Sequence, residues 1–208
     1  YGEFLSTVET MAGFLQHVCG VGRGDRVLLQ MQNCPQFVAA FYAILRADAV
    51  VVPVSPMNVT DELVHNIDDS GAKVAFVGQE LFDRIQPLMD GRVAHVIVAT
   101  YSDALTGPTE LTVPDAVRAP RQRFDVPGAV AWADALERDF APRAPTAGAD
   151  DLAAILYTSG TTGKPKGCMH THRTLMCTTV GAALWETMFA DSVILSTAPM
   201  FHVTGMQH

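Results

Sequence analysis

The chain has 208 residues, which is enough for one sizeable hydrophobic core and for one or two domains. Hydrophobic residues make up 49% of it and charged residues 17%, a composition typical of a globular rather than a disordered protein. Because 22 acidic residues outnumber 14 basic residues, the formal charge is −8, which argues against a general nucleic-acid binder and a basic membrane-surface protein. Any affinity for phosphate must therefore be local.

The first half of the chain alternates between two kinds of segment. Short apolar runs predict buried strands, and the runs between them have the spacing of helices. This alternation predicts an α/β layered domain, with a mostly parallel sheet covered by helices on both faces. The expected strands cover residues 26–32, 49–56, 73–78 and 93–99, and the expected helices cover residues 5–18, 36–47, 60–71 (with Thr60 as N-cap) and 80–89.

The middle of the chain breaks this pattern. Residues 100–127 form a long polar connection with four of the 12 prolines, which predicts a surface excursion or a partly mobile segment. A short helix is expected at 129–138, followed by a stretch rich in Pro, Ala and Gly at 141–149. The chain is therefore divided into a first α/β half (1–99), a polar connection with a short helix (100–150) and a last segment (151–208).

Cysteine use and hydropathy favour a cytoplasmic protein. The four cysteines include no C-x-x-C pair, so zinc and redox chemistry are not indicated, and we expect reduced, mostly buried thiols. The longest apolar run, 37–45, is about half as long as a membrane span requires. The chain begins without Met inside a predicted helix and has no basic flank, which argues against a secretory signal and predicts further residues upstream.

One loop differs from the rest of the sequence. The apolar residues 155–157 are followed by TSGTTGKPKG, which combines glycines, hydroxyls and two lysines. Glycines let backbone amides approach a ligand closely, and the hydroxyls and lysines complete a cradle for phosphate. No Asp or Glu occurs between Asp151 and Glu186, so an anion meets no carboxylate nearby in the sequence. The residues of this predicted phosphate loop are Thr158, Ser159, Gly160, Thr161, Thr162, Gly163, Lys164, Lys166 and Gly167.

Two common nucleotide loops do not fit this spacing. The triphosphatase loop requires four residues between its glycines and a Ser or Thr after its lysine, whereas only two residues separate Gly160 from Gly163 and Pro165 follows the lysine. The dinucleotide pattern G-x-G-x-x-G fails because no glycine stands two residues before Gly160. A plain exposed turn is the remaining alternative, and the glycine spacing, the lysines and the acid-free window argue against it.

The sequence YTSGTTGKPKG, residues 157–167, resembles residue for residue the phosphate-binding motif of the adenylate-forming superfamily. This superfamily includes acyl-CoA synthetases, luciferases and the adenylation domains of peptide synthetases. The segment APMFHVTGM, residues 198–206, is similar to the family's next motif, and further matching segments cover nearly the whole chain. The resemblance implies an incomplete N-terminal AMP-binding domain. The family's adenine, ribose and catalytic-lysine motifs and its C-terminal domain are missing, so we expect this chain alone to be inactive.

The resemblance implies a two-step reaction that uses ATP, Mg²⁺ and coenzyme A. A carboxylate attacks the α-phosphate of ATP to give an acyl-adenylate and pyrophosphate, and the thiol of coenzyme A then displaces AMP. Positioning and charge neutralisation supply most of the catalysis in such a displacement. By the same resemblance, residues 158–163 and Lys166 hold the leaving phosphates, and Thr158 contacts the metal-bound phosphate. Lys164 occupies a position that varies in the family. No direct metal ligand or catalytic residue is assigned.

By the same resemblance, His202 and Thr204 match positions that border the acyl pocket near the reacting carboxylate. A lone histidine is more often structural, but the surrounding motif reverses that preference. Asp48 departs from the family, in which Gly is usual there, and we expect little effect on the chemistry. Histidines and acids without such a context are expected to be surface, helix-face or solvated residues: His17, His65, His95, Asp68 and Asp69.

The implied function is ATP-dependent activation of a carboxylic acid, with a fatty acid as the preferred substrate, followed by thioester formation with coenzyme A. Three alternatives stay open: an aromatic-acid CoA ligase, an adenylation domain that loads a carrier protein, and a non-catalytic nucleotide-binding module. The expected partners are the acid, ATP and coenzyme A, with no nucleic acid and no transmembrane segment. A homodimer is compatible with the sequence.

Overall fold

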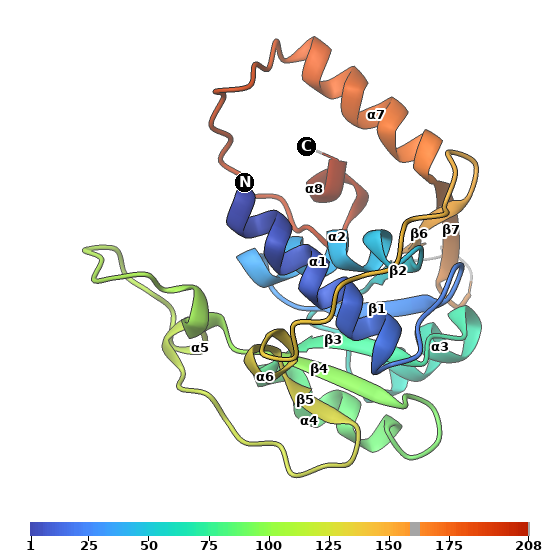
Figure 1. The fold of residues 1–208 in the computed structure, drawn as a ribbon, viewed down its shortest axis with the longest axis vertical. Coiled ribbons are helices and arrows are strands. Elements are labelled where there is room, and N and C mark those ends of the chain that lie inside the picture. The colour runs from blue at the N-terminus through green and yellow to red at the C-terminus, as the bar shows by residue number, and fades with distance from the viewer. Residues whose placement is uncertain (159–162, 208) are drawn as a thin grey trace.

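The computed structural model describes residues 1–158 and 163–207. Its centre is a seven-stranded sheet with the strand order β5-β4-β3-β1-β2-β6-β7 (Figure 1). Neighbouring strands are parallel except β6 and β7, which form an antiparallel hairpin. The strands are β1 (Arg26–Gln30), β2 (Val50–Pro53), β3 (Val74–Gly78), β4 (His95–Ala99), β5 (Ala129–Ala131), β6 (Leu152–Thr158) and β7 (Lys166–Thr171).

Helices cover both faces of the sheet, as the sequence predicts. Alternate residues of a strand point to opposite faces, so one strand serves two cores. Phe76 of β3 lies in the core built with the first two helices, whereas its neighbour Val77 lies in the core built with α3. The helices are α1 (Gly2–His17), α2 (Pro35–Arg46), α3 (Thr60–Ser70), α4 (Phe82–Ile85), α5 (Asp115–Arg118), α6 (Trp132–Leu136), α7 (His172–Trp185) and α8 (Val203–Gln207), with 3₁₀ turns η1 (Gln79–Leu81), η2 (Gln86–Leu88) and η3 (Tyr101–Ala104).

Three local predictions are wrong. The helix expected at 129–138 begins only at Trp132, because 129–131 pair with β4 as the edge strand β5, and this pairing overrides the helix preference of alanine. Residues 80–89 form three short turns rather than one helix, and Pro87, which lacks an N–H, lies in the last. The N-cap of α3 is Val59 instead of Thr60, whose hydroxyl donates to the Arg84 carbonyl.

The prediction of mostly buried thiols is wrong, because two of the four cysteines are exposed and the other two are only partly buried. Cys19 and Cys34 are partly buried, and this burial raises the pKa of Cys19 to about 12 and that of Cys34 to about 11. Cys34 is the N-cap of α2, where its Sγ accepts a hydrogen bond from the Phe37 amide at 3.3 Å. Cys168 and Cys177 are exposed.

The connection at 100–127 is tied to the sheet by polar contacts. The Gln79 side chain donates to the Pro120 carbonyl at 3.0 Å and accepts from the Gln122 amide at 3.3 Å. The Ser102 hydroxyl donates to the Ala119 carbonyl at 2.8 Å. Within the described ranges, every helix is too short or too polar to cross a membrane.

Candidate functional site

The candidate site lies where parallel strands end. The carboxyl ends of β1, β2 and β6 meet at one edge of the sheet, because these strands are neighbours and parallel. A cavity of about 800 Å³ opens at this edge. Open α/β sheets commonly bind ligands outside the carboxyl ends of their strands. Four segments line the cavity: residues 53–58 after β2, residues 61–68 of α3, the β6–β7 hairpin and residues 201–203.

The β6–β7 hairpin presents the predicted phosphate loop. Thr158 ends β6 and Lys166 begins β7, and the two residues are paired across the hairpin. Both side chains are exposed, as is Gly163. Thr158 lines the cavity, and so does Lys164, whereas Lys166, the lysine that the resemblance assigns to the phosphates, is not among the lining residues. Ser159, Gly160, Thr161 and Thr162 lie outside the described residues.

Close packing, rather than the backbone freedom that a loop needs, explains why residue 167 is glycine. Gly167 faces Tyr157 across the hairpin, and a Cβ atom there would lie 2.6 Å from the Ile155 side chain and 3.4 Å from the Tyr157 ring. The Tyr157 ring therefore packs against the backbone at Gly167, where any side chain would clash. This packing fixes the paired residues just below the loop.

Helix α3 holds the hairpin on both sides of the loop. The Tyr157 hydroxyl donates to Asp69 Oδ2 at 2.7 Å, and burial together with this carboxylate raises the pKa of Tyr157. On the far side of the loop, His65 Nε2 donates to the Pro165 carbonyl at 2.8 Å, since that carbonyl can only accept. The His65 and Tyr157 rings meet edge to face, with centroids 5.9 Å apart.

These contacts give His65 and Asp69 roles that the sequence does not reveal. His65 does lie on a helix face, as predicted, but that face lines the cavity. The signal available in the sequence is topological: a helix that follows a parallel strand begins near the carboxyl edge, so the first turns of α3 border the site. Asp68 is exposed and pairs with Arg92 at 2.9 Å, which agrees with its interpretation as a solvated residue.

The stretch without Asp or Glu, residues 152–185, has carboxylates of α3 near it in the folded chain. Asp61, Glu62 and Asp68 line the α3 side of the cavity, opposite the hairpin. The Glu62 carboxylate accepts a hydrogen bond from the Val59 amide at 2.9 Å, which caps the helix. His65, Lys164 and His170 line the same cavity with donors. In the described ranges, no group of three His, Cys, Asp or Glu residues is placed to hold a metal ion.

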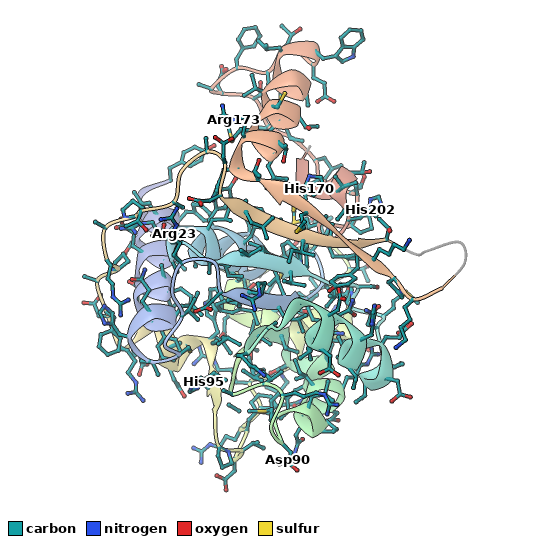
Figure 2. All side chains as sticks on the ribbon, turned by 90° about the vertical axis from the view of Figure 1, so that its right-hand side faces the viewer. Arg23, Asp90, His95, His170, Arg173 and His202 are labelled. Carbon is teal, nitrogen blue, oxygen red and sulfur yellow. The ribbon has the colours of Figure 1, made fainter. Side chains whose placement is uncertain are left out.

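His202 lies at the rim of the cavity. Its Nδ1 accepts a hydrogen bond from the Thr204 amide at 3.3 Å, so the proton of the neutral ring is on Nε2. Figure 2 shows His202 near His170 of β7, and both residues line the cavity. Thr204 is exposed on α8, and its side chain does not line the cavity. The structure therefore brings His202 and Thr158 to one cavity and leaves Thr204 beside it.

Comparisons with known proteins agree with this architecture. The family model described as "AMP-binding enzyme" matches residues 1–208. A long-chain-fatty-acid–CoA ligase of Salmonella typhimurium is 31% identical over 95% of this chain, and 4-coumarate-CoA ligase 2 of Narcissus pseudonarcissus is 31% identical over 94%. The match covers 37% and 33% of those two proteins.

A solved structure with similar features is that of ATP-bound MatB from Rhodopseudomonas palustris. It is 26% identical, with a TM-score of 0.76, over 99% of this chain and 36% of that chain. The chain thus spans little more than a third of the length of the relatives that it matches.

Proposed function

We propose, because this chain belongs to the AMP-binding enzyme family, that it is the first part of a longer acid–CoA ligase that forms AMP. In that reaction a carboxylate oxygen attacks the α-phosphate of ATP, and the bond to pyrophosphate breaks. The sulfur of coenzyme A then attacks the acyl carbon, and AMP leaves. The observation that carries the proposal is the phosphate motif, which joins β6 to β7 at the rim of the cavity.

The phosphate loop would hold the leaving pyrophosphate. Thr158 and Lys166 are paired across its base and both side chains are exposed, so a hydroxyl and an ammonium group stand on the two strands that lead into the loop. Backbone amides of residues 159–163 and the hydroxyls of the loop would add further donors, as in other glycine-rich phosphate loops. Mg²⁺ would be bound through the ATP phosphates and would neutralise charge there, with the Thr158 hydroxyl close to a metal-bound phosphate.

The cavity would take the acid, with His202 at its rim. Because Nδ1 of His202 is already an acceptor, Nε2–H is the donor that remains for a carboxylate. Val54, Leu156 and Phe201 give part of the lining an apolar character that suits an acyl chain or an aromatic ring. Thr204 would act on the acid only if α8 shifts relative to the cavity.

A fatty acid is the preferred substrate, since relatives named as long-chain-fatty-acid–CoA ligases are 28–32% identical to this chain. An aromatic acid is the second candidate, because the relative named 4-coumarate-CoA ligase is equally similar at 31%. The four free thiols favour the proposed cytoplasmic location. The homodimer stays a prediction of the sequence, which sedimentation of the longer protein would test.

A substrate panel on the longer protein tests the proposal. We expect AMP and pyrophosphate to form from ATP and Mg²⁺ only when an acid is present, and an acyl-CoA to form when coenzyme A is added. Fatty acids of increasing length and 4-coumarate or benzoate would separate the two substrate classes, and a carrier protein in place of coenzyme A would reveal the loading alternative. The 208-residue chain is the control and should form no acyl-CoA. A longer protein that binds ATP but releases no AMP with any acid would instead be a nucleotide-binding module.

A further inference from the structure

The segment that carries His202 reaches the sheet edge without being part of the sheet. Residues 189–197 before it form no strand in the described structure, and Val193 is 98% exposed. Met200 and Phe201 pack against the first core, which buries apolar area but does not by itself set the position of the backbone. The position of His202 at the cavity therefore needs a directional contact.

Asn33 supplies that contact from the opposite end of the sequence. Its Nδ2 donates to the Ala198 carbonyl at 2.8 Å, and its Oδ1 accepts from the Met200 amide at 2.9 Å. One side-chain amide thus satisfies a carbonyl and an N–H two residues apart, as a neighbouring parallel strand would do. Both distances are in the range of good hydrogen bonds.

Asn33 is itself fixed on both sides. The preceding amide, of Gln32, donates to the Tyr101 hydroxyl at 3.0 Å, and that hydroxyl donates to Glu80 at 2.7 Å. The following residue, Cys34, caps α2. The side-chain amide of Asn33 is therefore held at the carboxyl edge of β1 before it meets the His202 segment.

The turn at residues 198–206, which Asn33 contacts at its start, is compact. The His202 amide donates to the Pro199 carbonyl at 3.1 Å, and the Met206 amide donates to the His202 carbonyl at 3.0 Å. A Cβ atom on Gly205 would lie 2.3 Å from the Pro199 oxygen, so this turn closes tightly on itself. A hydrogen bond to Ala198 and Met200 therefore sets the position of His202 as well.

We propose that Asn33 is a positioning residue for the acid-binding site: it holds the 198–206 turn so that His202 faces the cavity. The inference rests on the proposed function, in which His202 borders the acid. Asn33 itself is not proposed to contact ATP. Loss of Asn33 should therefore weaken the use of the acid and leave the use of ATP nearly unchanged.

The test compares Asn33→Ala, Asn33→Asp and the control Gln32→Ala in the longer protein. Gln32 is an exposed neighbour whose backbone amide, which the substitution keeps, makes its contact with Tyr101. From pyrophosphate release we expect Asn33→Ala to raise KM for the acid about tenfold, the size of losing one or two hydrogen bonds, with KM for ATP changed less than about twofold. Asn33→Asp keeps the acceptor for Met200 but loses the donor to Ala198, and should fall between. Gln32→Ala should resemble the wild type.

Hydrogen exchange in the longer protein without substrates gives a readout that does not depend on activity. We expect the Met200 amide to lose protection in Asn33→Ala and to keep it in Gln32→Ala, with thermal melting to verify that each variant folds. Equal increases in both KM values, or an unchanged KM for the acid, would overturn the positioning role. An unchanged exchange rate of the Met200 amide in Asn33→Ala would show that the Asn33 side chain does not hold the 198–206 turn. If the wild type uses no acid at all, the proposed function is wrong. The exchange measurement then still shows whether Asn33 holds the 198–206 turn.

Discussion

Asp48 has a left-handed backbone, with φ of 61°, at the turn between α2 and β2. Glycine adopts this conformation without strain, which is a physical reason for the glycine usual in the family at this position. The aspartate compensates with its side chain: Oδ2 accepts from the Thr146 amide and hydroxyl at 2.8 and 2.7 Å, and Oδ1 accepts from the Ala147 amide at 3.1 Å. Asp48 thus ties the stretch before β6 to the core.

These hydrogen bonds predict a stability that depends on pH. Burial works to raise the pKa of Asp48, but the hydrogen bonds from Thr146 and Ala147 hold it below the usual 3.8. The carboxylate therefore stabilises the fold above about pH 4, and this contribution is lost as the pH falls through the lowered pKa. We expect Asp48→Asn to cost about 1–2 kcal/mol at pH 7 and much less below pH 3, as measured by urea unfolding.

Two further variants separate the side chain of Asp48 from its backbone. Asp48→Ala should be less stable than Asp48→Gly by about 1 kcal/mol, because both lose the carboxylate but only alanine is strained at positive φ. Asp90, an exposed residue, gives the control Asp90→Asn. A pH-independent loss in Asp48→Asn, or one as small as in the control, would contradict this account.

At the scale of elements, α3 and the β6–β7 hairpin act as a unit. Tyr157 and Pro165 flank the phosphate loop, and α3 contacts both through Asp69 and His65. We expect Tyr157→Phe, which removes only the hydroxyl, to lower the free energy of unfolding by about 1 kcal/mol. Tyr42, whose side chain is exposed on α2, gives the matched control Tyr42→Phe with little effect.

A double-mutant cycle tests whether the Tyr157 effect belongs to the contact with Asp69. Asp69→Asn alone should also destabilise the chain, and the double variant should be less destabilised than the sum, by about 1 kcal/mol. Strict additivity of the two variants would show that the hydroxyl and the carboxylate do not stabilise the fold through each other.

The strands of the first half could be predicted from the sequence because they are short, buried and β-branched, as in Val50–Val52. The edge strand β5 could not be predicted, since the sequence AVA favours a helix and only its pairing with β4 makes it a strand. The phosphate motif is likewise local in the sequence and could be recognised there. His65, Asp69 and Asn33 could not, because their contacts lie 88 to 167 residues away and only the sheet topology brings the partners together.

At the scale of the whole molecule, the chain has two unlike parts. Residues up to β6 enclose two cores, whereas α7 stands away from the sheet (Figure 1) and has Leu175 as its one buried residue in the described structure. Leu184, Trp185, Val193 and Leu195 are each more than three-quarters exposed. Large apolar surfaces of this kind are uncommon on complete soluble domains, which supports the proposal that this chain is part of a longer protein.

In the proposed function, the loop after β6 holds the leaving phosphates of ATP while an acid is activated. The most direct measurement is acid-dependent pyrophosphate release by the longer protein, compared between Lys166→Ala and Lys164→Ala. We predict that Lys166→Ala loses about 100- to 1000-fold in kcat/KM, as expected for removal of a charged group that stabilises the transition state, and that Lys164→Ala stays within about tenfold of the wild type. Full activity in Lys166→Ala, or pyrophosphate release that needs no acid, would contradict the account.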